Sequence, residues 1–242
     1  MKVLIVAGHG GTREDGKLLD NGACSPFGKE AEKTRTFCSK LATLVPNCEL
    51  YDINKNLYEE LRTNRFNPTK FRNYDYILEV HFNAFRPDIE GNRETMGTEI
   101  LVSSYEKELT IAENIVNAVA KNGFKNRGIK FRNDLQNINI GYRNGVNYGM
   151  LEICFIDDKD DMEVYAERFS HILEDVAKAL GYKGVRNVRY NKLYEIPAWG
   201  KTTIEKIINK GLLKGDDKGN LNLSEDMLRM FVVNDRGGLY DK

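Results

Sequence analysis

Apolar and polar positions follow two alternating patterns along the first 182 residues, and the alternation predicts a sheet covered by helices. Short apolar runs rich in β-forming residues predict strands at 3–7, 48–53, 76–80, 97–102 and 148–156. Between them, apolar residues spaced three or four apart predict helices at 29–45, 109–119 and 161–180. Strands that alternate with helices are typical of an α/β fold with a mostly parallel, twisted central sheet flanked by helices.

The last quarter of the chain has a different pattern. Residues 184–189 contain glycine and basic residues and predict a linker between a catalytic domain at 1–183 and a small module at 190–242. The module shows amphipathic stretches at 201–210 and 224–233 and no strand pattern, so we expect it to be helical. In the first domain, residues 12–27 are glycine-rich and polar and predict a surface loop, the charged run 54–65 is typical of a solvated helix face, and residues 124–147 give no clear pattern.

Composition narrows the classes of function. The 36 basic and 36 acidic residues cancel, which argues against a nucleic-acid binder. No apolar run approaches the roughly 20 residues of a membrane span, and glycines after Ala7 interrupt the first run before it could form a signal peptide. We therefore expect a protein made in the cytoplasm without a signal peptide. The four cysteines are scattered without paired spacing, which fits neither a disulfide framework nor a structural zinc knot.

Two histidines follow predicted strands at the point where each strand ends. His9 comes after the strand at 3–7, and His81 comes directly after the strand at 76–80. Open α/β sheets build their sites at the carboxyl ends of parallel strands, so these two side chains can meet there. Taken singly, a histidine at a strand end is more often a core residue bonded to a backbone carbonyl.

A catalytic zinc ion takes three protein ligands from histidine and carboxylate and keeps one position for water. His9 and His81 would supply two ligands. The third should be an acid at the start of the helix at 29–45, where Glu30, at the head of the helix, is the best placed and Glu32 is next. Their side chains point to different helix faces, so only one can serve, and the alternative for both is complementation of the helix dipole.

One acid, Glu152, lies in the middle of the strongly apolar strand at 148–156. A carboxylate there is costly unless it is paired or lies near a cation. Beside the two histidines, Glu152 would act on a zinc-bound water, whose pKa is about 7, and the reaction would be amide hydrolysis. The alternative is a structural ion pair with Arg127, Lys130 or Arg143.

Several motifs occur in the order seen in zinc-dependent N-acetylmuramoyl-L-alanine amidases, the kind found in clostridial phage endolysins and bacterial autolysins. The resemblance covers most of residues 1–182 and is carried by Gly8-His9-Gly10-Gly11, the stretch 29–35, Val80-His81-Phe82-Asn83-Ala84, Gly97-Thr98-Glu99, Asn126-Arg127-Gly128 and Leu151-Glu152-Ile153. The chain departs from the family before the late glutamate, where residues 147–150 replace a usual proline-alanine pair.

This resemblance implies that His9, Glu30 and His81 bind one Zn²⁺, with Glu32 as the alternative acid, and that Glu152 is catalytic. On the same motifs we expect Asn83 and Arg127 to contact substrate. The family implies peptidoglycan hydrolysis at the bond between the lactyl group of N-acetylmuramic acid and L-alanine. The protein would then act on the cell wall after release, through a phage holin or lysis of the mother cell.

The module at 190–242 resembles, more loosely, helical modules of such lysins and S-layer homology repeats, through Pro197-Ala198-Trp199 and the stretch 211–215. That resemblance implies attachment to the wall. A homo-oligomerising or merely stabilising appendage is the alternative. For the whole chain, two other functions stay open: a zinc peptidase such as a carboxypeptidase of related fold, and a non-catalytic wall-binding protein with structural histidines.

Overall fold

The structure is a computed structural model that describes residues 1–183 and 189–241. The chain divides into two compact units, Met1–Tyr182 (unit 1) and Lys183–Lys242 (unit 2). The linker predicted at 184–189 lies, apart from Arg189, outside the described residues.

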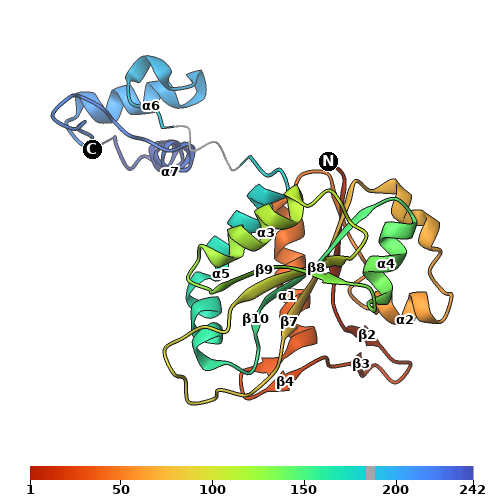
Figure 1. Ribbon diagram of the computed structural model, residues 1–242. Helices are drawn as coiled ribbons and strands as arrows, with labels where there is room; N and C mark the ends of the chain where they lie inside the picture. Colours follow the sequence, from red (N-terminus) through yellow and green to blue (C-terminus); the bar gives the residue numbers. More distant parts are fainter. Residues whose placement is uncertain (184–188, 242) are drawn as a thin grey trace. The chain divides into compact units, whose positions relative to one another are not determined.

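Unit 1 is built on one six-stranded sheet with the strand order β6-β1-β7-β10-β8-β9 (Figure 1). The strands are β1 Val3–Ala7, β6 Cys48–Leu50, β7 Tyr76–Asn83, β8 Thr98–Ser103, β9 Asn126–Arg132 and β10 Asn147–Phe155. Every neighbouring pair is parallel except β10 and β8, which are antiparallel. The mostly parallel sheet predicted from the sequence is confirmed.

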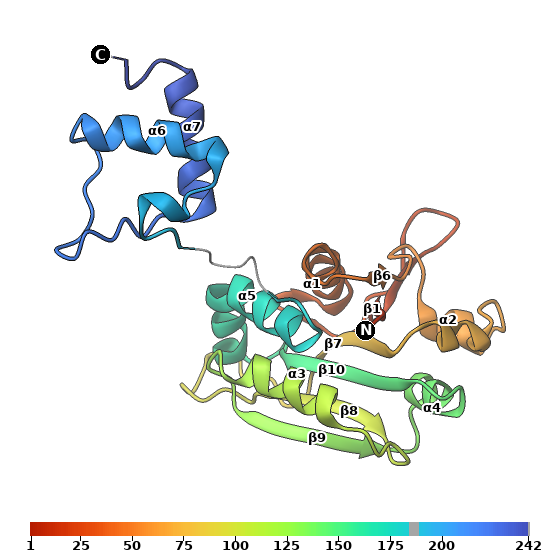
Figure 2. The same cartoon turned by 90° about the horizontal axis from the view of Figure 1, so that it is seen from above.

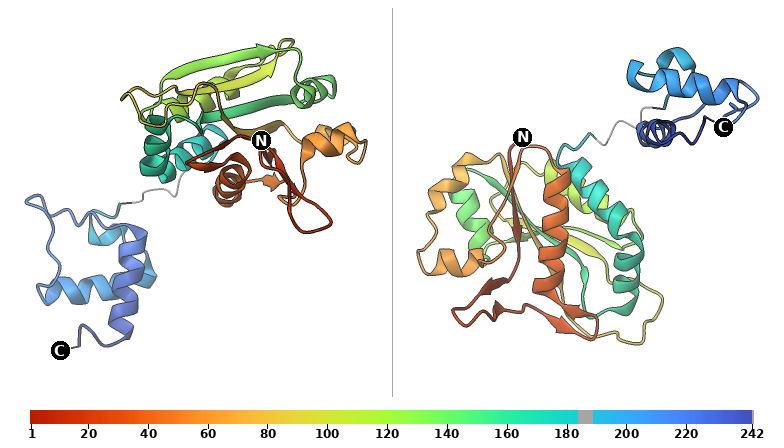
Figure 3. Two further views of the ribbon diagram at one scale, coloured as in Figure 1. Left: turned by 90° about the horizontal axis from the view of Figure 1, so that it is seen from below. Right: turned by 180° about the vertical axis from the view of Figure 1, so that it is seen from behind.

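Helices cover both faces of this sheet (Figure 2, and the right view of Figure 3). One face packs against α1 Glu30–Leu44, α3 Thr110–Ala120 and α5 Lys159–Ala179. The other packs against α2 Leu57–Arg62, α4 Gln136–Arg143 and the 3-10 helix η1 Pro68–Asn73. This three-layer arrangement confirms the predicted α/β class.

The central strand β7 shows how the sequence divides the two cores. Successive side chains of a strand point to opposite faces. Leu78 and Val80 belong to the core beneath α1, α3 and α5, whereas Ile77 belongs to the core beneath α2 and α4. Glu79 and His81 follow Ile77 at intervals of two residues, so both polar side chains leave the strand on the α2 and α4 face.

Two segments differ from the sequence prediction. The unassigned stretch 124–147 holds β9 and α4; β9 has no fully buried residue, so it carries no apolar signal. The region 12–27, expected to be loop, contributes two small hairpins, formed by β2 Gly10–Thr12 with β3 Leu18–Asp20 and by β4 Cys24–Ser25 with β5 Gly28–Lys29. The charged run 54–65 agrees with its prediction: it forms α2, which buries Leu57 and Leu61 on one face and exposes Tyr58 and Arg62.

Unit 2 contains the 3-10 helix η2 Leu193–Glu195 and two helices, α6 Ala198–Asn209 and α7 Glu225–Arg236. Its own apolar core includes Ile204, Ile207 and Leu228. The Ser224 hydroxyl caps α7 by accepting a hydrogen bond from the backbone N–H of Met227 at 3.2 Å. Across the described parts of both units, no helix combines the length and apolarity needed to cross a bilayer.

Asp161, in the first turn of α5, links the start of β8 to the end of the antiparallel strand β10. Its buried carboxylate accepts hydrogen bonds from the backbone N–H of Phe155 at 2.8 Å and of Gly97 at 3.1 Å. We expect Asp161→Ala to leave both buried donors without a partner and to lower the free energy of unfolding of unit 1 by about 2–4 kcal/mol.

Calorimetry of the full chain tests this expectation. The transition of unit 1 should move down by about 4–16 °C, while the transition of unit 2 stays in place. Glu163→Ala is the matched control, because it removes only an exposed ion pair with Lys159 from the same helix and should change stability by less than about 1 kcal/mol. Equal stability of Asp161→Ala and the control would contradict this role.

Candidate metal centre

Strand register brings three polar side chains side by side near the carboxyl end of β7. His81 on β7 pairs with Glu152 on β10, and Glu152 pairs in turn with Glu99 on β8. These three residues occupy one row across three neighbouring strands. The sheet therefore delivers an imidazole and two carboxyls to one edge of its face.

His9 reaches the same place through an unusual turn after β1. Its φ is +59°, and Gly10 and Gly11 follow with φ of +74° and +80°, so three successive residues adopt the left-handed region. For a non-glycine residue this conformation is uncommon and is held by its surroundings. Arg35 of α1 holds it here, because its Nη2 donates to the backbone carbonyl of His9 at 3.0 Å.

Glu30, the first residue of α1, lies between the two imidazoles and is only 3% exposed. Its Oε1 is 2.9 Å from His81 Nδ1, and its Oε2 is 3.2 Å from His9 Nε2. The backbone N–H of Phe82 and of Ala23 donate to the same two oxygens at 3.0 and 2.8 Å. One nitrogen from each histidine and a Glu30 oxygen lie within 4.8 Å of one another.

Two glycines leave the space that this cluster needs. A Cβ on Gly8 would lie 2.4 Å from the His81 ring, and one on Gly22 would lie 2.6 Å from Glu30 Oε2. Both distances are far below van der Waals contact. Because Gly8 and Gly22 have no side chain, the imidazoles and the Glu30 carboxylate can pack directly against the backbone at these two positions.

The electrostatics of the cluster favour positive charge between these groups. Burial alone would raise the pKa of Glu30, but hydrogen bonds from His81 and His9 bring it well below its usual range. Burial alone would lower the pKa of His81, but the Glu30 and Glu79 carboxylates raise it well above its usual value. The pKa of His9 is also raised, mainly by Glu30 against the opposing effect of burial.

Each histidine meets another carboxylate on its far side, away from Glu30. His9 Nδ1 lies 2.8 Å from Asp20, which also accepts a hydrogen bond from Asn56 at 3.2 Å. His81 Nε2 lies 3.3 Å from the buried Glu79. Sequence reasoning gave neither acid a role. Glu79 did leave a signal, because it is the one charged residue inside an apolar run.

Glu152 is close to the cluster but forms no ion pair among the described residues. Its Oε2 is buried and has no hydrogen-bond partner. Burial raises the pKa of Glu152 to about 7, although the charge on His81 acts in the opposite direction. The alternative of a structural pair with Arg127 does not hold, because Arg127 Nε donates to Glu99 at 2.7 Å instead.

The remaining predicted site residues lie on either side of this centre. Asn83 donates to Glu99 at 2.9 Å, so Asn83, Glu99 and Arg127 form one network beside Glu152. Contact of Asn83 and Arg127 with substrate stays a prediction. Glu32 is separate: its side chain is 64% exposed and pairs with Lys29 at 3.6 Å, so it does not join the two histidines.

The donor set suits a divalent metal ion. Two imidazole nitrogens and one carboxylate oxygen converge, and this combination of ligands is typical of catalytic metal sites in hydrolases. The buried Oε2 of Glu152 accepts no hydrogen bond from the described residues. This nearby carboxylate can therefore accept a proton. His9, Glu30 and His81 therefore fit a metal ion, with Glu152 free to act on a reacting group.

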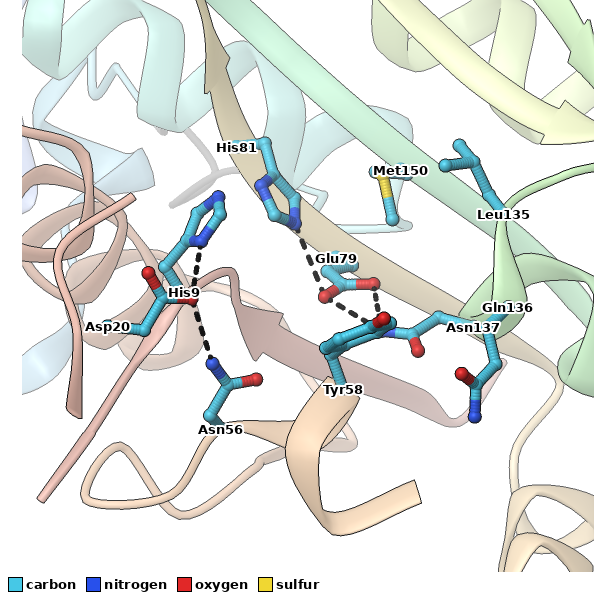
Figure 4. A pocket seen from close by; sticks show the side chains of 10 residues that line it. All are labelled: His9, Asp20, Asn56, Tyr58, Glu79, His81, Leu135, Gln136, Asn137 and Met150. Carbon is cyan, nitrogen blue, oxygen red and sulfur yellow. Dashed lines mark hydrogen bonds and ion pairs between the residues drawn. The ribbon is translucent and has the colours of Figure 1, made fainter. Parts of the chain in front are cut away.

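A cavity of about 270 Å³ opens beside His9 and His81 (Figure 4). From the histidines it runs past Glu79 toward Asn137 at the start of α4 and toward Met150 on β10. The two imidazoles therefore border a hollow large enough to admit part of a substrate, whereas Glu30 and Glu152 are not among the residues that line it.

A family model described as N-acetylmuramoyl-L-alanine amidase matches residues 3–182 of this chain. The chain is 28% identical over 116 residues to the probable autolysin PH of Staphylococcus aureus, an alignment that covers 48% of this chain and 23% of that protein. The chain spans less than half the length of the curated relatives it matches.

Solved structures support the same fold. The catalytic domain of the CD27L endolysin targeting Clostridia difficile is 20% identical with a TM-score of 0.56, and the match covers 74% of this chain and 96% of that domain. An N-acetylmuramoyl-L-alanine amidase from Clostridium difficile 630 is 16% identical with a TM-score of 0.56, covering 76% and 98%. Identities this low show likeness of fold alone.

Proposed function

Because the chain belongs to the N-acetylmuramoyl-L-alanine amidase family, we propose that it is a zinc-dependent peptidoglycan hydrolase that cleaves the amide between N-acetylmuramic acid and L-alanine. The observation that carries this proposal is the convergence of His9, Glu30 and His81 beside Glu152. The substrate lies outside the cytoplasmic membrane. The proposal therefore includes action on the cell wall after release from the cell that makes the protein.

His9, Glu30 and His81 would hold the zinc ion. When bound, the ion supplies a Lewis acid that polarises the amide carbonyl and makes water more acidic. The protein contributes a rigid arrangement of these side chains, because Gly8 and Gly22 confine them and backbone N–H groups fix the Glu30 carboxylate. Holding the ligands in advance lowers the entropy lost when the ion and the substrate bind.

Glu152 would act as the general base and acid. Its buried carboxylate can take the proton of the attacking water and deliver it to the nitrogen of the departing L-alanine. With the pKa raised toward neutrality by burial, the carboxyl exchanges protons near physiological pH. A bound cation would lower this pKa and favour the carboxylate form that accepts the proton.

Zinc should bind through Glu30 and not through Glu32. The purified protein should bind one zinc ion per chain. Glu30→Gln should weaken zinc binding by more than about 100-fold, because loss of a residue that only supports a metal ligand already costs up to about that factor. Glu32→Gln, two residues along the same helix, is the control and should bind zinc like wild type. Competition with a chromophoric chelator measures both. Equal affinities in the two variants would rule out Glu30 as a ligand.

Hydrolysis of the wall should depend on Glu152. Glu152→Gln keeps the size of the side chain but cannot accept a proton, so lysis of purified walls should slow by at least about 100-fold. Mass spectrometry of the wild-type digest should show intact stem peptides with a free L-alanine amine. Shortened stem peptides would instead indicate a zinc peptidase. Wild-type rates in Glu152→Gln, or full lysis after exhaustive chelation, would contradict the mechanism.

We also propose that unit 2 attaches the enzyme to the wall. Unit 2 has an apolar core separate from the cores of unit 1. On its surface it carries two aromatic residues, Tyr194, which is 79% exposed, and Trp199, which is 46% exposed. The guanidinium of Arg229 lies 5.5 Å from the centre of the Trp199 ring. Aromatic rings with a polar edge are enriched where proteins bind partners.

Cosedimentation with purified walls tests this attachment. The full chain carrying Glu152→Gln should sediment with walls without digesting them, and adding Tyr194→Ala with Trp199→Ala should weaken binding by about fivefold or more. Lys201→Ala, which changes an exposed residue of the same helix α6, is the control. Undiminished binding in the aromatic double variant would overturn this role, and a chain that self-associates without binding walls would favour oligomerisation.

A further inference from the structure

Glu79 is a buried carboxylate on β7 that the proposed reaction does not use. It is 3% exposed and lies 3.3 Å from His81 Nε2, the ring nitrogen opposite the one that faces Glu30 (Figure 4). This contact has the length of an ion pair without the alignment of a hydrogen bond. Among the described residues, Nε2 has no hydrogen-bond partner.

Two buried side chains from other elements fix the Glu79 carboxylate. Asn137 of α4 donates its amide N–H to both carboxylate oxygens at 3.0 and 3.1 Å. The hydroxyl of Tyr148 on β10 donates to Oε2 at 2.7 Å. Asn137 and Tyr148 are 2% and 1% exposed. Side chains of α4 and β10 therefore hold a carboxylate of β7, more than 50 residues earlier in the chain, next to the His81 ring.

Asn137 and Tyr148 are neutral and cannot explain why the side chain is an acid. A carboxylate in an apolar core is costly, and neutral donors compensate it only in part. His81 is the one group with which Glu79 forms an ion pair in the described structure. A negative charge there calls for a positive charge on the His81 ring, carried either by a proton or by a cation bound at the nitrogen that faces Glu30.

We propose that Glu79 is a positioning residue for the metal centre. It holds the His81 ring so that Nδ1 faces the cluster, and it strengthens that nitrogen as a ligand for a divalent cation. Carboxylates behind metal-binding histidines have this effect in other proteins. Asp20 stands in the same relation to His9 but is 41% exposed, so its contribution should be smaller. The inference rests on the proposed function, since it assumes that His81 binds zinc.

The test measures zinc affinity and metal-free stability separately. Glu79→Gln should weaken zinc binding by about 10–100-fold in competition with a chelator. Its melting temperature without metal should change little, because His81 keeps its partner Glu30 and the variant keeps an oxygen that accepts from Asn137 and Tyr148. Tyr148→Phe should weaken zinc binding less than Glu79→Gln. Glu99→Gln, a buried acid two strands away that does not contact His81, should keep wild-type affinity.

The outcomes are distinct. Unchanged zinc affinity in Glu79→Gln, together with a lower melting temperature without metal, would show a merely structural acid and overturn the inference. A loss as large as that of Glu30→Gln, with an altered coordination number in the Co²⁺ absorption spectrum, would make Glu79 a ligand and also overturn it. If the wild-type protein itself does not bind zinc, the proposed function fails and this inference fails with it.

Discussion

The structure of unit 1 depends on one buried carboxylate with an imidazole on each of its oxygens. Glu30 is inside the protein, where a lone negative charge would be unstable. It is compensated by His9, His81 and two backbone N–H groups, and three of these four partners lie more than 20 residues from Glu30 in the chain. The compensation is complete only when β1, β7 and α1 are all in their native places.

The parts of the fold around Glu30 follow from this requirement. The parallel register of β1 and β7 brings His9 and His81 to one end of the sheet. The left-handed turn at His9 aims its ring at Glu30, and Arg35 of the same helix holds that turn. Glycines at positions 8 and 22 permit side chains to approach where a Cβ would collide. Together these features allow the two imidazoles and the Glu30 carboxylate to converge.

The sequence predicted the sheet, its covering helices and the two strand-end histidines, because periodicity and strand ends are local signals. The choice between Glu30 and Glu32 could not be made from the residues alone. Both stand at a helix start, and only the tertiary structure shows that Glu30 points between the histidines while Glu32 faces solvent. The place of Glu30 at the head of the helix and the resemblance to a family both favoured it, but neither shows where its side chain points.

Other contacts were beyond sequence reasoning for a physical reason. Asn137 belongs to α4, in a stretch whose apolar residues are too few to predict a helix, yet it reaches Glu79 on a distant strand. Asp20 lies in a segment that was expected to be loop and that forms a hairpin strand instead. Partners of a buried polar group are set by the packing of whole elements, which no local pattern encodes.

The most direct test of the central claim is anomalous X-ray diffraction from crystals of the protein grown with zinc, with data collected on both sides of the zinc absorption edge. The account predicts one strong anomalous peak in unit 1, in contact with His9, Glu30 and His81. A peak elsewhere with these three side chains still bonded only to one another, or no peak at all, would contradict it.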